Sequence, residues 1–154
     1  MKTIKNIILG FNLIFFTFSA TAQESPFGDY YWTLASLTIS PAVDVDMDGK
    51  VDTDLLFLIP PCERDDTYRY QNDGTIIVNR GKIQCEDDEE KIEEVGTWSY
   101  DKKTKKLILD KYDTRKNTEV IVEFSSASKI VSIKKIESPE GTHTARTIFK
   151  AVKK

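Results

Sequence analysis

The feature that most limits the fold is a series of short segments in which polar and apolar residues alternate, separated by turn sequences. The clearest segment is NTEVIVEFS at 117–125, in which Val120, Val122 and Phe124 share one side. Successive side chains of a strand point to opposite faces of the sheet, so this pattern predicts a strand with one buried face. The sequence NDG at 72–74 separates two further segments and is a strong hairpin signal. The chain is therefore predicted to be all-β.

About eight segments of this kind can be recognised. They cover residues 30–40, 67–71, 75–81, 96–101, 106–113, 117–125, 129–137 and 142–154. The nearest candidate for a helix is TDLLFLIP at 53–60, which Pro60 and Pro61 end after two turns at most. An eight-stranded antiparallel up-and-down barrel with one short helical turn is expected, because consecutive hairpins need no crossover and closure removes the sheet edges. A β-sandwich is the alternative.

Residues 1–22 are typical of an export signal. Two lysines open the segment, a mostly apolar stretch follows, and Ala20 and Ala22 give the small-residue pattern that a signal peptidase needs. We expect cleavage after Ala22, which leaves a single domain over 23–154, exported to the periplasm or beyond the cell. No cysteine lies near this point to carry a lipid anchor. No later segment approaches the roughly 20 apolar residues of a membrane-spanning helix.

Charge and residue types narrow the possible partners and activities. The formal net charge is −3, and removal of the two lysines of the signal makes the domain more negative still. Nucleic acid is not an expected partner, because phosphate binding needs a basic face. His143 is the only histidine, so a histidine-rich metal site is excluded, and a Ser-His-Asp triad would depend on this one residue. Its alternation with Thr142 and Thr144 indicates an ordinary strand position, and we expect a monomer that is not an enzyme.

The chain has two cysteines, Cys62 and Cys85. In an exported protein an even number of cysteines favours a disulfide, which would stabilise the fold by roughly 3 kcal/mol on the chain-entropy model. A pair of free thiols or a pair of metal ligands is the alternative. The acidic run EDDEEKIEE at 86–94 is interpreted as a solvated loop that leads into a strand.

The most distinctive stretch is DVDMDGKVDTD at 44–54. Counted from Asp44, aspartates fall at positions 1, 3, 5 and 9, with Gly49 at position 6. The calcium loop of EF-hands uses side-chain oxygens at 1, 3 and 5, a glycine at 6 for the sharp turn, and a backbone carbonyl at 7. Position 12 is Leu55 rather than a bidentate glutamate, so an EF-hand is not expected. The pattern instead resembles calcium loops found between strands of extracellular proteins.

The predicted ligands of this loop are the carboxylates of Asp44, Asp46, Asp48 and Asp52 and the backbone carbonyl of Lys50, with Asp54 as a further donor. Like charges that the turn brings together repel, and a divalent cation removes that cost. The expected ion is Ca²⁺ in a structural role, with an affinity on the order of 10⁻⁴ to 10⁻³ M. The alternative is an open, hydrated loop whose aspartates point apart.

The order of these motifs resembles the lipocalin-like domains of secreted bacterial proteins. The matching residues are WTLAS at 32–36, the aspartate loop with the DLL that ends it, Cys62 with Asp65 and Asp66, NDGT at 72–75, Gly81, Cys85, GTW at 96–98, Leu107 and Leu109. The resemblance implies a calycin-type barrel with a disulfide between Cys62 and Cys85. It also suggests that Arg146 stacks on Trp32 at a closed end. The G-x-W signature of classical lipocalins is not met, since Gly28 lies four residues before Trp32.

Two functions are consistent with such a barrel. In the first, which we expect, the interior binds a small apolar molecule in a cavity. In the second, large aromatic side chains fill the interior, and the protein is a structural or interaction module. The candidate core aromatics are Trp32, Trp98, Phe124 and Phe149. An open apolar pocket of several hundred Å³ would favour the first function, and a solid interior would favour the second.

Overall fold

The structure is a computed structural model that describes residues 25–114 and 117–153. In this part of the chain the strands are β1 (Tyr31–Val43), β2 (Asp52–Asp54), β3 (Thr67–Tyr70), β4 (Thr75–Asn79), β5 (Ile92–Asp101), β6 (Lys106–Lys111), β7 (Thr118–Ser126), β8 (Lys129–Ser138) and β9 (Gly141–Val152). A 3₁₀ turn, η1, spans Leu56–Leu58. The predicted signal and its cleavage after Ala22 lie outside the described residues. None of the described residues forms a helix long and apolar enough to cross a membrane.

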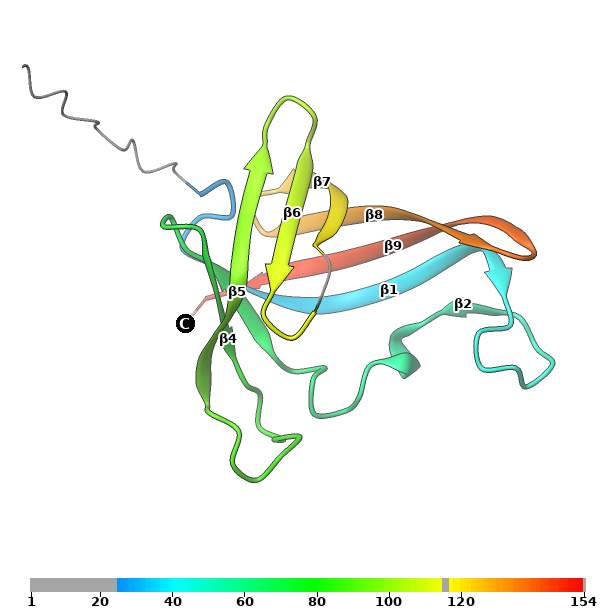
Figure 1. Ribbon diagram of the computed structural model, residues 1–154, viewed down its shortest axis with the longest axis horizontal. Coiled ribbons are helices and arrows are strands. Elements are labelled where there is room, and N and C mark those ends of the chain that lie inside the picture. Colours follow the sequence, from blue (N-terminus) through cyan, green and yellow to red (C-terminus); the bar gives the residue numbers. More distant parts are fainter. Residues whose placement is uncertain (1–24, 115–116, 154) are drawn as a thin grey trace, which may run out of the picture.

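The strands form a closed antiparallel barrel (Figure 1). From β3 to β9 each strand pairs with the next one in the sequence, and β9 pairs with β1 along residues 31–40. The barrel closes where β1 pairs with β3 through Trp32 and Thr33. Eight strands therefore enclose the core, and β2 is an additional short strand beside Thr38 and Val43 of β1. The predicted up-and-down barrel is confirmed, and the sandwich alternative is wrong.

Alternation within the strands decides which side chains face the interior. In β7, Val122 is buried, whereas its neighbour Ile121 is exposed on the outer face. The buried cluster consists of Phe27, Trp32, Ile76, Trp98, Leu107, Val122 and Ile130. Phe149 packs against this cluster. Phe124, a predicted core residue, is 37% exposed because it lies near the end of β7, where the pairing with β8 is irregular.

Three strands continue beyond the barrel as an arm that carries the aspartate loop at its end (Figure 1). β7 pairs with β8 only as far as Ile133, whereas β8 runs on to Ser138 and turns into β9. β1 follows β9 along this stretch through the pair of Ile39 and Ala145, both of which are buried. The arm therefore has buried residues of its own, outside the core cluster.

His143 is part of the arm and has a structural position. It is 4% exposed, and its Nδ1 donates to the carbonyl of Pro41 at 3.0 Å. Its Nε2 lies 2.9 Å from the hydroxyl of Ser138. These bonds join the ends of β1 and β8 to β9.

Cys62 and Cys85 form the expected disulfide, with an S–S distance of 2.00 Å. It links the segment before β3 to the loop between β4 and β5. The alternatives of free thiols and of a cysteine metal pair are therefore excluded.

The suggested stacking of Arg146 on Trp32 is wrong. In the register of β1 and β9, Arg146 lies opposite Thr38, whereas Trp32 lies opposite Ala151. Arg146 is exposed, and Trp32 is buried with its Nε1 donating to the carbonyl of Phe27 at 3.2 Å. The partner of the indole comes from the segment before β1, which carries no strand pattern.

Candidate functional site

The barrel interior contains a cavity of about 170 Å³. Side chains from β1, β3, β6, β7, β8 and β9 line it, together with one residue of the segment before β1. Trp32, Leu107, Val122, Ile130 and Phe149 supply much of the apolar lining. The lining includes no charged side chain, so the cavity is suited to a neutral and mainly apolar occupant.

The segment before β1 closes one end of the interior. Phe27 is 2% exposed, and its ring stacks on Tyr70 at 4.3 Å and meets the edge of Trp98 at 5.2 Å. The backbone amide of Ser25 donates to the side chain of Asn72 at 2.8 Å, and the Ser25 hydroxyl donates to the carbonyl of Tyr70 at 3.2 Å. Asn72 belongs to the β3–β4 turn, so the segment crosses the barrel end at which that turn lies (Figure 1). The Phe27 ring thus occupies space that would otherwise enlarge the cavity.

Three side chains with hydroxyl groups interrupt the apolar lining. Ser132 of β8 and Thr147 of β9 lie opposite each other in the pairing of these strands, and Tyr70 contributes from β3. Burial, and to a smaller extent the neighbouring Tyr68, raises the pKa of Tyr70. Its phenol therefore stays neutral at ordinary pH. The cavity offers hydrogen-bonding groups without offering charge.

The aspartate loop at the end of the arm brings three predicted ligands together. Carboxylate oxygens of Asp44, Asp46 and Asp48 lie within 4.8 Å of one another. The backbone amides of Asp48 and Gly49 donate to the Asp44 carboxylate at 3.1 and 2.9 Å, which curls the loop around it. Gly49 has φ +88°, a left-handed conformation that residues with a Cβ resist. The three carboxylates do not point apart, and they could hold a metal ion.

The remaining predicted ligands take other positions. Asp52 begins β2, and its Oδ2 accepts a hydrogen bond from the amide of Val45 at 3.4 Å. Asp54 accepts from an amide at the start of η1. The ammonium group of Lys50 lies 3.6 Å from Oδ2 of Asp48, and both side chains are exposed. Asp52 and Asp54, at the C-terminal end of the loop region, therefore accept hydrogen bonds from backbone amides, and neither is one of the three converging carboxylates.

The chain was compared with protein-family models, with curated proteins and with solved structures. None of these comparisons found a match. The strand number and the meander order are those of small up-and-down barrels such as calycins.

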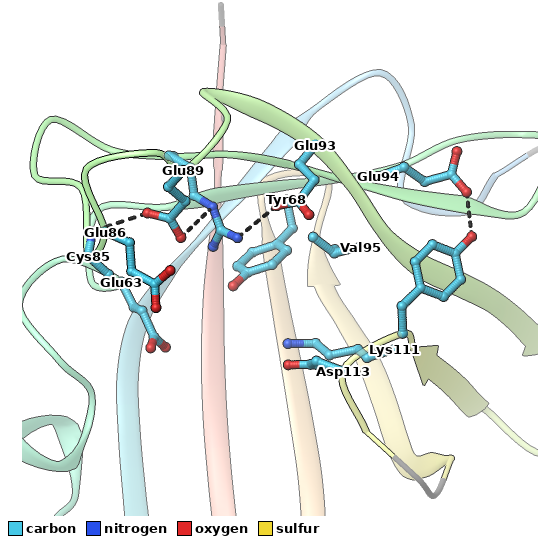
Figure 2. Close-up of a pocket in the computed structure, with 12 residues that line it drawn as sticks. Glu63, Tyr68, Cys85, Glu86, Glu89, Glu93, Glu94, Val95, Lys111 and Asp113 are labelled. Atoms are coloured by element: carbon cyan, nitrogen blue, oxygen red, sulfur yellow. Dashed lines mark hydrogen bonds and ion pairs between the residues drawn. The ribbon is translucent and has the colours of Figure 1, made fainter.

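A second hollow, of about 340 Å³, lies between the β4–β5 loop and the end of β6, and we call it the acidic cleft (Figure 2). Its carboxylates belong to Glu63, Glu86, Glu89, Glu93, Glu94 and Asp113. Only Arg80 and Lys111 among the lining residues carry positive charge. The excess of carboxylates gives the cleft a negative potential, which repels anions and attracts cations.

Arg80 neutralises the most buried part of this cleft. Its guanidinium lies 3.2 Å from Asp66, 3.1 Å from Glu89 and 3.0 Å from Glu93, and Asp66 is only 1% exposed. Asp66 also accepts from the amide of Gly81 at 2.8 Å. Desolvation lowers the pKa of Arg80, but hydrogen bonds to Asp66 and Glu93 outweigh it, so the pKa is raised overall. Three carboxylates thus converge on one cation that the chain itself supplies, and we call this group the Arg80 cluster.

Tyr68 lies between the acidic cleft and the core. Its ring lines the cleft and also packs against the core cluster. The ammonium group of Lys111 lies 5.5 Å from the ring centre, and Figure 2 shows the Lys111 side chain extending toward it. Burial, followed by the negative charge of Asp66, raises the pKa of Tyr68 to about 12. The cleft is therefore bounded on its inner side by a neutral phenol.

The Arg80 cluster and the hydroxyls of the cavity were not predicted from the sequence. The run at 86–94 is mostly exposed, as interpreted, but Glu89 and Glu93 are half-buried against Arg80. Spacing could not reveal this, because Arg80 follows β4 and the carboxylates follow in a separate loop and strand. Ser132 did leave a signal, since it alternates with Ile130 on the inward face of its strand.

Proposed function

We propose that this protein is an exported, non-catalytic, lipocalin-like barrel that binds a small and mainly apolar molecule. The observation that carries the proposal is the cavity of about 170 Å³ beside the core cluster. Protein interiors are close-packed, and voids much larger than a water molecule are few. An engineered cavity of about 150 Å³ with an apolar lining, in another protein, stays dry and binds benzene.

The volume of the cavity limits the ligand. Drug-sized molecules occupy pockets of roughly 300–1,000 Å³, and this cavity is smaller. A single ring or a short alkyl group is therefore the expected size of the apolar body. The packing of Phe27 against Tyr70 and Trp98 favours the second candidate, a filled barrel that acts as a structural or interaction module.

A cavity-filling substitution separates the two candidates. Val120 lines the cavity, whereas Ile121, the next residue of β7, is exposed on the outer face. Val120→Phe places a ring inside the barrel, and Ile121→Phe places the same ring outside. Benzene is the probe, and its binding is measured by the rise in Tm and by chemical-shift changes in NMR spectra.

For a binding barrel, benzene raises the Tm of the wild type and of Ile121→Phe, and the rise is lost in Val120→Phe. The spectrum of Val120→Phe must remain that of a folded barrel, so that loss of binding is distinguished from loss of structure. Absence of any benzene effect on the wild type would establish the filled barrel instead.

We further propose that the aspartate loop binds Ca²⁺ in a structural role. The supporting observation is the convergence of Asp44, Asp46 and Asp48 around a turn whose amides already bond to their carboxylates. Ca²⁺ takes six to eight oxygen ligands, so the carbonyl of Lys50 and water would complete the shell. The ion would remove the repulsion among the three carboxylates, of which Asp46 and Asp48 are exposed and Asp44 is half-buried.

Calorimetric titration with Ca²⁺ tests this second proposal. The wild type is expected to show one site with a Kd on the order of 10⁻⁴ to 10⁻³ M. About 10 mM Ca²⁺ would then stabilise the fold by roughly 1.4–2.7 kcal/mol. Asp46→Ala with Asp48→Ala abolishes both effects, whereas Asp87→Ala with Asp88→Ala, which removes two exposed acids elsewhere, leaves them unchanged. If the wild type shows neither binding heat nor a rise in Tm on addition of Ca²⁺, the calcium site is refuted.

A further inference from the structure

We propose that the ligand of the interior cavity carries one hydroxyl or carbonyl group, which the hydroxyls of Ser132 and Thr147 bind. The ligand class is therefore a small neutral alcohol, phenol or ketone with an apolar body of about one ring. This inference rests on the proposed function, because it describes the occupant of the same cavity.

The position of the two hydroxyls is the first support. Ser132 and Thr147 face each other across β8 and β9, and both line the cavity. Ser132 is 8% exposed. Within residues 25–114 and 117–153, neither hydroxyl makes a hydrogen bond to another group. Thr147 is half-buried, and neither hydroxyl oxygen belongs to the fully buried, unpartnered polar atoms of the described residues. Both are therefore open to the cavity, where the polar atom of an occupant can reach them.

The surroundings of Ser132 give the second support. It shares the inward face of β8 with Ile130, and on the neighbouring strand it lies opposite Val122. Both neighbours are buried apolar residues of the core cluster. Valine or alanine would meet the packing needs of this position equally well, so the fold alone does not call for a hydroxyl here.

The absence of charge in the lining narrows the ligand further. An ionised group placed in this cavity would lack a counter-ion among the lining residues, and burying an unpaired charge is strongly unfavourable. Serine and threonine hydroxyls both donate and accept, so a neutral hydroxyl or carbonyl suits them. Water could also satisfy these groups. A ligand that displaces such a water is favoured when its own polar atom restores the hydrogen bonds.

The test compares phenol with benzene, two probes with the same ring that differ by one hydroxyl. Their Kd values are measured by calorimetry for the wild type, Ser132→Ala, Thr147→Val and Ser99→Ala. Thr147→Val keeps the branched shape of the side chain, and Ser99 is an exposed serine of β5 that serves as the matched control. The informative quantity is the ratio of the two Kd values in each protein.

The wild type and Ser99→Ala are expected to prefer phenol, and the preference should fall about tenfold in Ser132→Ala or Thr147→Val. If either hydroxyl has a purely structural role, its removal would weaken the binding of both probes equally and leave the ratio of their Kd values unchanged. If the wild type binds benzene but shows no preference for phenol, this inference is wrong while the proposed function stands. The same conclusion follows if the ratio of the two Kd values is unchanged in Ser132→Ala and Thr147→Val. Failure of both probes to bind the wild type overturns both.

Discussion

The aspartate loop and the Arg80 cluster each bring three carboxylates close together, but they differ in how the repulsion between these charges is compensated. In the Arg80 cluster the chain supplies its own cation, at 3.0–3.2 Å from all three acids. In the aspartate loop the nearest cation is the ammonium of Lys50, which is 84% exposed and 3.6 Å from Asp48 alone. Backbone amides hold the loop in shape without cancelling its charge.

The difference shows which acidic cluster is available to an external ion. Asp66 is almost fully buried, so its guanidinium partner must be permanent, and the cluster serves to hold the β4–β5 loop. The aspartates of the loop are at the surface, where water partly screens their repulsion and an ion can enter and leave. Acidity alone therefore does not identify a metal site, because burial and internal pairing decide whether the charge is available.

Arg80→Met should produce the largest effect, since it leaves Asp66 buried without its cation. Breaking a buried ion pair in this way typically costs about 3–5 kcal/mol. This loss of stability is measured as the change in the free energy of unfolding, obtained from urea denaturation. Lys50→Met removes an exposed cation beside an acid and is expected to change the same quantity by less than about 0.5 kcal/mol. Equal effects of the two substitutions would erase the distinction between the clusters.

High pH should weaken the barrel through Tyr68, which adjoins the Arg80 cluster. Burial and Asp66 raise the pKa of Tyr68 from 10.0 to about 12. A raised pKa means that the folded state favours the neutral phenol. The stabilisation is complete below pH 10 and is lost as the pH rises toward 12, by an amount on the order of 2–3 kcal/mol.

Urea unfolding at several pH values above 9, with tyrosinate absorbance recorded in parallel, measures this loss. Tyr68→Phe should reduce the alkaline loss, and the part that remains is assigned to the other groups with raised pKa values, among them Tyr70, Tyr112 and Lys106. An alkaline loss that is the same in Tyr68→Phe would contradict the assignment. The aspartate loop contains no tyrosine, so it should add nothing to the tyrosinate absorbance.

Asp46→Asn in metal-free buffer should have the smallest effect and the opposite sign. It removes one of three mutually repelling charges, so stability rises by a few tenths of a kcal/mol. With added Ca²⁺ the wild type should become more stable than Asp46→Asn, because it binds the ion more tightly than the variant does. Thermal melts with a chelator and with Ca²⁺ measure both signs. A loss of stability in the chelated sample would mean that the Asp46 charge is already compensated.

Several parts of the fold were predictable because their physical cause is local. Alternation and the NDG turn predicted the strands around them, and Pro60 limited the helical candidate to one turn. Strand bounds were less accurate. β5 begins at Ile92, inside the acidic run, because its partner strand β4 continues to Asn79 opposite it. A pairing partner far away in the chain can extend a strand through residues whose own preferences indicate a loop.

By itself, the sequence determined the all-β class, the positions of most strands, the two cysteines available for a disulfide and the acidic turn centred on Gly49, because alternation and turn residues act over a few neighbouring positions. The tertiary structure decided the rest. It placed Phe27 in the end of the barrel, joined Arg80 to three acids from different segments, and aligned Ser132 with Thr147 on the cavity wall. These features depend on barrel closure and strand register, which bring together residues whose separation in the sequence carries no signal.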